Sequence, residues 1–352
     1  MYNISSLIRE NIKSLQPYSS ARDEFSGTAN VFLDANENSL GSPLGNDHTR
    51  YPDPHQLQLK LAIARDKGLM TGNIFLGNGS DECIDILYRC FCNPGKDNVI
   101  ICPPTYGMYE VSAHVNDIEI RKAILLDNFQ LDIKAINYLC DDSTKMIWLC
   151  SPNNPTGNSI DAREIKQLAR NFNGLVVIDE AYIDFAAQDS LINELINYPN
   201  LVVLQTFSKA WGLAALRLGM AFASNEIIAV LNKVKPPYNI SGPTQQLVLN
   251  ALHNKEQFET NVAALKTLRT SLTKDLEKIP LIEKLYPSDA NFLLVRVKDA
   301  IAVYNYLLSN GIVVRNRSNI VLCDSCLRIT VGTPTENELL VTALINYLNR
   351  II

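Results

Sequence analysis

One lysine stands in the middle of an apolar stretch that reads LVVLQTFSKAWGLAALRLGM from Leu201 to Met220. Ser208 directly precedes this residue, Lys209, and Arg217 follows it eight residues later. Lysine is seldom fully buried unless it is paired or used in chemistry. An apolar setting lowers the pKa of a lysine, and the unprotonated amine is a nucleophile toward carbonyl carbon. The stretch therefore makes Lys209 a candidate reactive amine that the fold buries.

Polar side chains follow four other apolar runs. They are Ser80 and Asp81 after NIFLGNG, Tyr106 after VIIC, Asn154 after KMIWLC, and Asp179 and Tyr182 at the end of LVVID and beyond. Taken singly, each has an ordinary alternative, such as a turn, a helix N-cap or a core tyrosine, and Lys209 itself could extend to the surface. Ligands of open α/β sheets bind outside the carboxyl ends of the strands. Together, the five strand ends would offer one ligand an amine, a carboxylate, an amide, phenols and a helix start suited to phosphate.

The elements that must position these residues alternate along the centre of the chain. Strands are predicted at 145–150, 175–179 and 201–205, with a helix at 161–172. Continuous β-branched runs that alternate with helices favour a mostly parallel sheet covered on both faces. Beyond the breaker-rich KPPYNISGP, a smaller α+β domain is predicted, with a long helical stretch at about 244–277, strands at NFLLVRV and CLRITVG, and a last helix at about 335–350.

Composition argues against several classes of protein. The 352 residues carry a net charge of −5 without a basic run, so we expect no nucleic-acid partner. The apolar stretches fall short of the roughly 20 residues that span a bilayer, and we expect neither a secretory leader nor a membrane partner. The eight cysteines lie mostly in apolar segments, which is typical of a reducing cytoplasm. Cys323 and Cys326 form a single C-x-x-C pair, so we expect no metal site.

The motifs NNPTG, DEAY and SK, with an arginine downstream, occur in an order and spacing that resembles the fold-type I, pyridoxal-phosphate-dependent aminotransferases. The resemblance covers nearly the whole chain. It implies an α/β fold with a large cofactor-binding domain over residues 30–240. Residues 241–352 would form the smaller domain, with residues 1–29 packed near it. It also implies pyridoxal 5′-phosphate as the cofactor.

The resemblance assigns the reactive groups. Lys209 is expected to carry the cofactor as a Schiff base and, once substrate displaces it, to move a proton between the substrate α-carbon and the cofactor. Asp179 is expected to keep the pyridine nitrogen protonated, which makes the ring an electron sink. Asn154 and Tyr182 are expected to hydrogen-bond the phenolic oxygen of the ring.

The remaining positions are expected to hold the cofactor. Tyr106 would stack on the ring face. The backbone N–H groups of Ser80 and Asp81, at a helix start, would bind the phosphate, with Ser208 and Arg217 completing that site.

Sequences near both termini are similar to histidinol-phosphate aminotransferases: LDANEN and RYPDP upstream, and VRNRS followed by LRITVGTP downstream. The resemblance implies transfer of an amino group between histidinol phosphate and 2-oxoglutarate. Arg315 and Arg328 would grip the substrate phosphate, and Tyr18 would also reach it. Tyr51 would reach the cofactor phosphate of the other subunit, so the resemblance implies a homodimer with composite sites.

Departures from that pattern leave other substrates open. Ser39, Ala215 and Met220 replace the usual proline, glycine and tyrosine, and the usual Pro-Gly between Ser318 and Leu327 is missing. A threonine-phosphate decarboxylase and an aromatic amino-acid aminotransferase therefore remain alternatives. A cofactor-sensing regulator is not expected, because too few residues precede the first motif for a DNA-binding module. A catalytically inactive relative is not expected either, because every key position is filled.

Overall fold

The large sheet is mostly parallel, as predicted. The computed structural model describes residues 3–25, 27, 29–45 and 48–351. The strand order is β1 (Ile74–Asn78), β7 (Leu218–Phe222), β6 (Leu201–Thr206), β5 (Leu175–Asp179), β4 (Thr144–Cys150), β2 (Asn98–Ile101) and β3 (Glu119–Lys122). Only β7 runs against its neighbours, so the carboxyl ends of β1, β2, β4, β5 and β6 meet at one edge.

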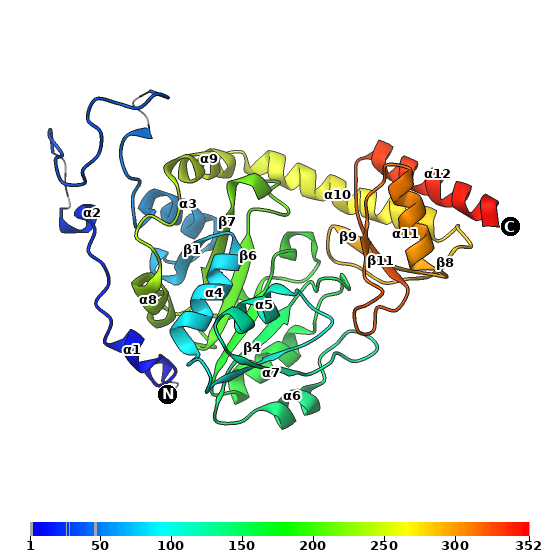
Figure 1. Cartoon of the computed structure of the whole chain (residues 1–352), viewed down its shortest axis with the longest axis horizontal. Coiled ribbons are helices and arrows are strands. Elements are labelled where there is room, and N and C mark those ends of the chain that lie inside the picture. Colours follow the sequence, from blue (N-terminus) through cyan, green and yellow to red (C-terminus); the bar gives the residue numbers. More distant parts are fainter. Residues whose placement is uncertain (1–2, 26, 28, 46–47, 352) are drawn as a thin grey trace.

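Helices cover both faces of this sheet (Figure 1). One face packs against α4 (Ser80–Phe91), α5 (Met108–Val115) and α8 (Asn225–Val234). The other packs against α3 (Leu57–Lys67), α6 (Ile133–Leu139), α7 (Ala162–Asn171) and α9 (Gly242–Leu252). Along β4, Ile147 and Leu149 point to one core and Met146 and Trp148 to the other. Burial on both faces explains why this strand reads as a continuous apolar run.

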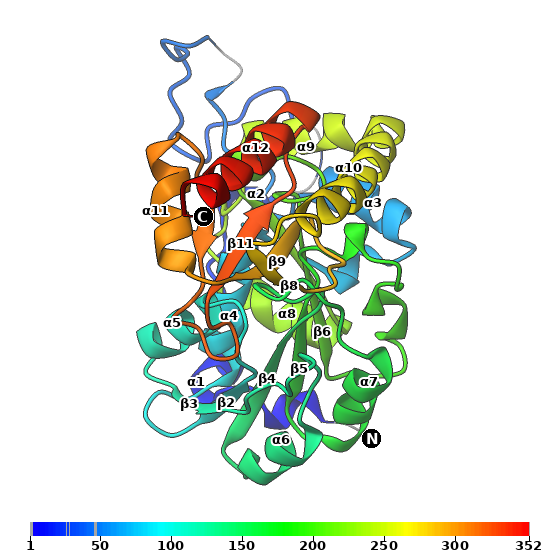
Figure 2. The same ribbon diagram turned by 90° about the vertical axis from the view of Figure 1, so that its right-hand side faces the viewer.

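A second sheet of four antiparallel strands forms the smaller α+β unit (Figure 2). Its order is β10 (Arg315–Asn316), β11 (Cys326–Thr330), β9 (Phe292–Val297) and β8 (Ile282–Leu285), and it packs with α10 (Lys255–Leu276), α11 (Ala300–Ser309) and α12 (Pro334–Ile351). The helical stretch predicted at about 244–277 is confirmed as two helices, because the chain leaves the helical path at His253 and Asn254 between α9 and α10.

The N-terminal residues pack differently from the expectation. Ile4 and Ile12, the latter in α1 (Glu10–Lys13), are buried in the core formed by α4 and α8, and the Arg9 Nη1 donates to the Arg89 carbonyl at 2.8 Å. These residues therefore lie against the large sheet and not beside the small one. The domain boundary near residue 240 stays a prediction.

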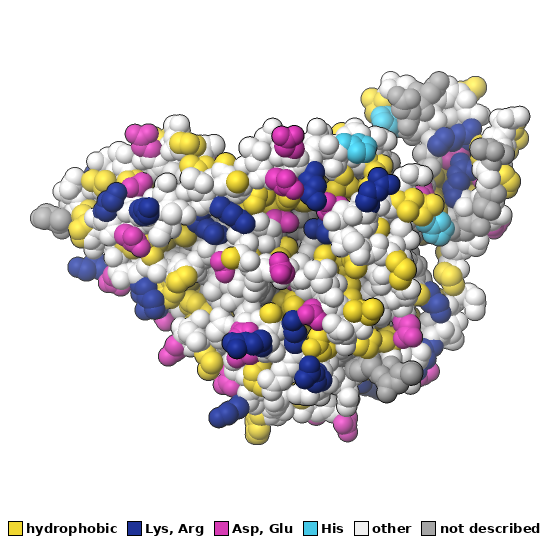
Figure 3. All heavy atoms as spheres, turned by 180° about the vertical axis from the view of Figure 1, so that it is seen from behind, with side chains coloured by type: hydrophobic (Ala, Val, Ile, Leu, Met, Phe, Trp, Pro, Cys, Tyr) yellow, Lys and Arg dark blue, Asp and Glu magenta, His cyan; other side chains and the backbone are white. Residues whose placement is uncertain are grey.

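Residues 21–25, 27, 29–45 and 48–50, which begin with α2 (Ala21–Glu24), form an arm that stands away from the body (Figure 1). Within it, Glu37 pairs with both Arg22 and Arg50. On the face shown in Figure 3, acidic and basic side chains are interspersed. Among the described residues, no helix combines the length and apolar character needed to cross a membrane, and no cluster of histidine, cysteine or carboxylate side chains is arranged to hold a metal ion.

Strand β7 and the start of α4 touch through backbone. A Cβ on Gly219 would lie 2.1 Å from the Ser80 nitrogen and 2.4 Å from the Gly79 carbonyl carbon. Neither atom can move away as the tip of a side chain could. The helix start that carries Ser80 therefore depends on the missing side chain at Gly219.

We predict that Gly219→Ala destabilises the protein by at least about 2 kcal/mol and loosens cofactor binding, because the added methyl must displace the start of α4. Thermal unfolding followed by circular dichroism, and cofactor retention after dialysis, measure the two effects. Gly242→Ala is the matched control, since its Cβ would meet only the Pro52 side chain at 3.7 Å. Equal stability of the two variants would contradict the prediction.

Candidate active site

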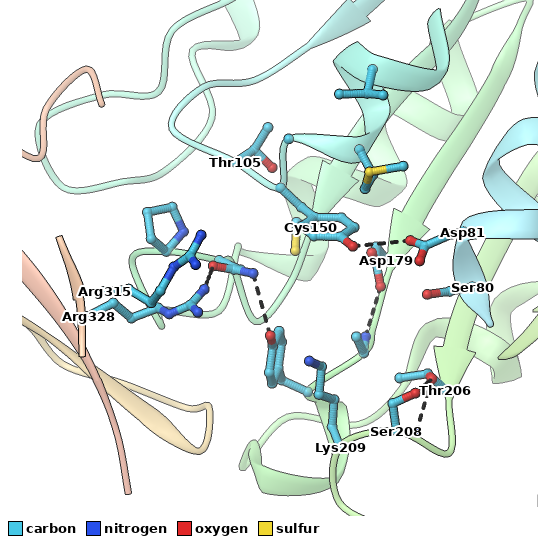
Figure 4. A pocket seen from close by; sticks show the side chains of 18 of the residues that line it. Ser80, Asp81, Thr105, Cys150, Asp179, Thr206, Ser208, Lys209, Arg315 and Arg328 are labelled. Carbon is cyan, nitrogen blue, oxygen red and sulfur yellow. Dashed lines mark hydrogen bonds between the residues drawn. The ribbon is translucent and has the colours of Figure 1, made fainter. Parts of the chain in front are cut away.

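A cavity of about 620 Å³ lies where the five strand ends face the small sheet (Figure 4). The predicted residues that line it are Ser80, Asp81, Tyr106, Asn154, Asp179, Tyr182, Ser208, Lys209, Arg217, Arg315 and Arg328. They come from segments up to about 250 residues apart in sequence, and the two arginines of β10 and β11 are the contribution of the small sheet. The strand-end reasoning thus located one common site.

Lys209 follows β6 and projects into this cavity. Its side chain is exposed to the cavity space, which corrects the expectation that the fold buries it in apolar packing. Its Nζ lies 5.5 Å from the ring centre of Tyr182. Desolvation by the surrounding protein, and then the charge of Arg328, lower the pKa of the Lys209 ammonium. Loss of the proton is therefore easier for Lys209 than for a lysine in water, and the unprotonated amine is the nucleophile.

Asp179 ends β5 on the floor of the cavity and is 3% exposed. Its Oδ1 accepts from the Ala181 N–H at 3.0 Å and its Oδ2 from the Tyr109 hydroxyl at 2.8 Å. Burial raises the pKa of the Asp179 carboxyl to about 6, against the opposing effect of these two hydrogen bonds. Among the described residues, no cation forms an ion pair with it, so a cationic group in the cavity would relieve the cost of its burial.

Tyr109 was missed by the sequence reasoning. It is fully buried on α5, and its ring stacks on Trp148 with centroids 5.1 Å apart. The Tyr88 hydroxyl donates to its backbone carbonyl at 2.9 Å. It lies three residues after Tyr106, and the two rings meet edge to face with their centroids 5.6 Å apart.

The start of α4 closes one end of the cavity. Ser80 and Asp81 occupy its first turn, where backbone N–H groups have no partner within the helix. The Arg217 Nη1 lies 3.4 Å from the Ser208 Oγ, and its Nη2 lies 3.5 Å from an Asp81 oxygen. The Tyr106 hydroxyl donates to the other Asp81 oxygen at 3.1 Å. This end joins a helix start to a guanidinium, and both attract anions.

The opposite end of the cavity joins the two sheets. The Arg328 Nη1 donates to the Asn154 Oδ1 at 2.5 Å, and the Asn154 Nδ2 lies 3.5 Å from the Tyr182 hydroxyl. Arg315 is the cross-strand partner of Arg328 in the antiparallel pair of β10 and β11. Two guanidinium groups therefore stand side by side above the amide.

Tyr18 and Tyr51 lie outside the cavity of their own chain. Tyr18 is 75% exposed. Tyr51 is 51% exposed, stacks on Tyr238 at 4.5 Å between ring centres, and is held by its N–H, which donates to Glu37 at 2.7 Å. The single chain does not bring these two tyrosines to the other predicted residues.

The sequence reasoning also missed Thr105, Cys150, Thr206, Arg317 and Ile320, which line the cavity. Arg317 could have been predicted from its spacing, because it lies two residues after Arg315 and an extended strand places such residues on one face. Cys150 and Thr206 end β4 and β6 and could have been found as strand ends.

These features fit pyridoxal phosphate. A buried carboxylate without a cation suits a protonated pyridine nitrogen, and an amine of lowered pKa suits an aldehyde. A helix start with an arginine suits a phosphate. The half-buried Tyr106 also lines the cavity and offers an aromatic ring.

Comparison with known proteins gives the same result. A profile of the family described as aminotransferase class I and II matches residues 26–344. The histidinol-phosphate aminotransferase of Parabacteroides distasonis is 54% identical over 346 residues, which are 98% of this chain and 99% of that protein. That of Cytophaga hutchinsonii is 51% identical over 346 residues, 98% of this chain and 99% of that protein.

Solved structures of histidinol-phosphate aminotransferases have the same fold as this chain. The histidinol-phosphate aminotransferase from Clostridium acetobutylicum matches with a TM-score of 0.80 at 26% identity, covering 86% of this chain and 92% of that one. The enzyme from Sinorhizobium meliloti in complex with pyridoxal-5′-phosphate shares the fold, with a TM-score of 0.81 at 24% identity over 90% of each chain. The cofactor of this chain is pyridoxal 5′-phosphate, and its activity is transamination. The chain belongs to the class I and II aminotransferases and, within them, to the histidinol-phosphate aminotransferase family.

Proposed function

We propose that this enzyme moves an amino group between L-histidinol phosphate and 2-oxoglutarate, a reaction of histidine biosynthesis. The observation that carries this proposal is the pair Arg315 and Arg328, which face one cavity from neighbouring strands without a carboxylate partner among the described residues. Two guanidinium groups match the two charges of a phosphate monoester. The names of the relatives that are about half identical to this chain support the same substrate.

When bound, pyridoxal phosphate supplies an aldehyde that takes up the amino group and a protonated ring that accepts electrons from the substrate α-carbon. Lys209 attaches the cofactor through Nζ and, once released, moves the α-proton. Asp179 holds the proton on the pyridine nitrogen. Tyr182 and Asn154 donate hydrogen bonds that orient the ring.

The remaining cavity residues hold the cofactor and the substrate acid in this proposal. Ser80, Asp81, Ser208 and Arg217 bind the cofactor phosphate, and Tyr106 lies on the ring face. Asn154 is also assigned to substrate binding. Its amide oxygen accepts a hydrogen bond from the Arg328 guanidinium, which places Asn154 next to the proposed site of the substrate acid.

The working unit is proposed to be a cytoplasmic homodimer with composite sites, in which Tyr51 reaches the cofactor phosphate of the other subunit. Tyr18 reaches the substrate phosphate. The arm supports this, because it exposes apolar side chains that a partner would cover: Val31, Leu33, Leu40 and Leu44. The cysteines, all free and mostly buried, support a reducing compartment.

Asp179→Asn is expected to lower kcat at least about a hundredfold, because the amide keeps the shape but removes the charge that holds the ring proton. Steady-state kinetics on the cofactor-loaded variant measure this effect. Asp184→Asn, which neutralises a nearby carboxylate that does not line the cavity, is the matched control and should keep most activity. Normal turnover by Asp179→Asn would mean that another group protonates the ring.

Mixing Lys209→Ala with Tyr51→Ala is expected to restore part of the activity that each variant lacks alone. In a hybrid dimer, one of the two sites would receive both an intact Lys209 and an intact Tyr51. Activity is assayed after the subunits have exchanged, and each variant incubated alone is the control. A fully active monomer in analytical ultracentrifugation would contradict the composite site.

Histidinol phosphate is expected to exceed histidine and phenylalanine as amino donor by at least about a hundredfold in kcat/KM, which is about 2.7 kcal/mol. Arg315→Gln should narrow this ratio and leave the visible spectrum of the cofactor unchanged, because Arg217 holds the other phosphate. A donor panel with 2-oxoglutarate as acceptor makes the measurement. Phenylalanine as the better donor, or release of carbon dioxide from threonine phosphate, would overturn the proposed substrate.

A further inference from the structure

A third arginine faces the same end of the cavity as Arg315 and Arg328. The backbone N–H of Arg317 donates to the Cys326 carbonyl at 2.8 Å, which extends the pairing of β10 with β11 by one step. Side chains two apart on an extended strand point to one face, so Arg317 lies on the face of Arg315. All three guanidinium groups line the cavity.

The charge of Arg317 is not compensated within the described part of the chain. Its Nε is buried without a hydrogen-bond partner there, and no aspartate or glutamate in that part forms an ion pair with any of the three arginines. Burial, and then the charges of Arg328 and Arg315, lower the pKa of the Arg317 guanidinium. Like charges on neighbouring strands destabilise a sheet. A cluster with this cost points to an anion that offsets it.

The three arginines are not equivalent. Arg328 is fixed by its hydrogen bond to Asn154, which in turn lies 3.5 Å from the Tyr182 hydroxyl. In this position it can bind a single negative charge. Arg315 is the most exposed of the three. Arg317 is half-buried and lines the cavity, so its charge acts inside the cavity.

The two substrates of the proposed reaction differ in charge at the acid that enters this end. A phosphate monoester carries close to two negative charges at neutral pH, whereas a carboxylate carries one. A carboxylate is matched by one well-placed guanidinium. Additional guanidinium groups gain most from the second charge and the third oxygen of a phosphate.

We propose that Arg317 is a specificity-determining residue that makes this cavity prefer a phosphate monoester dianion over a carboxylate. The inference rests on the proposed use of this cavity for the substrate acid, and it deepens that proposal. Arg328 serves both acids, and Arg317 serves the phosphate.

Arg317→Gln tests the proposal because glutamine keeps a polar side chain and removes the charge. We expect kcat/KM for histidinol phosphate to fall at least about tenfold, chiefly through a higher Michaelis constant. The Michaelis constant for the acceptor 2-oxoglutarate, and kcat/KM for phenylalanine, should change less than about threefold. Arg317→Lys, which restores the charge but not the paired N–H groups of the guanidinium, should recover part of the lost kcat/KM. Arg296→Gln is the matched control, since Arg296 lies on adjacent β9 and does not line the cavity.

A second measurement does not depend on turnover. Inorganic phosphate, added to the cofactor-loaded enzyme at constant ionic strength, should raise the Tm of the parent enzyme and of Arg296→Gln, and raise that of Arg317→Gln clearly less. In the absence of phosphate, Arg317→Gln should be at least as stable as the parent enzyme, because one repulsive charge is gone.

The possible outcomes separate the two proposals. An equal loss of kcat/KM for every substrate, or a loss of stability without phosphate, would make Arg317 a structural residue and overturn the inference. Unchanged kinetics with unchanged phosphate protection would overturn it as well. If the parent enzyme prefers phenylalanine, the proposed substrate fails, and phosphate protection alone then decides the role of Arg317.

Discussion

The burial of one carboxylate, Asp179, is the constraint on which the site depends. A buried carboxylate is costly unless hydrogen bonds and a cation stabilise it. The protein supplies the hydrogen bonds through Tyr109 and the Ala181 N–H. Tyr109 is itself fixed by stacking on Trp148, whose side chain lies in the core beneath α4 and α5. In the proposed function the protonated pyridine nitrogen of the cofactor is the cation, and the floor of the cavity is one preorganised half of that ion pair.

Charge in the cavity is separated along its length. The Asp179 carboxylate lies on the floor, Lys209 projects into the cavity, and arginines stand at both ends, with Arg217 near the start of α4 and Arg328 at Asn154. In the proposed function, Arg217 binds the cofactor phosphate and Arg328 binds the substrate phosphate. The scaffold keeps these groups apart by placing them on different elements, since Arg217 precedes β7 and Arg328 lies in β11. Binding of the two phosphates can then be altered separately.

The sequence predicted the parallel sheet and most of the cavity because both follow from local patterns. Strands buried on both faces read as apolar runs, and the residues after them must meet at one edge. The break at His253, the packing of Ile4 and Ile12, and the exposure of Lys209 to the cavity were not predictable in this way, because they depend on contacts between distant segments. Tyr109 was missed because a buried tyrosine that holds a carboxylate looks like an ordinary core residue in the sequence. The roles of the cavity residues and the domain boundaries remain predictions.

The hydrogen bond between Arg328 and Asn154 joins the four-stranded sheet to the seven-stranded one. Lys209 is positioned by the large sheet, and Arg315 and Arg328 are positioned by the small one. In the proposed reaction, a substrate therefore contacts both sheets at once, with its amino carbon near Lys209 and its acid at the arginines. The separation of the two sheets then sets the distance between amino carbon and charged group that a substrate needs.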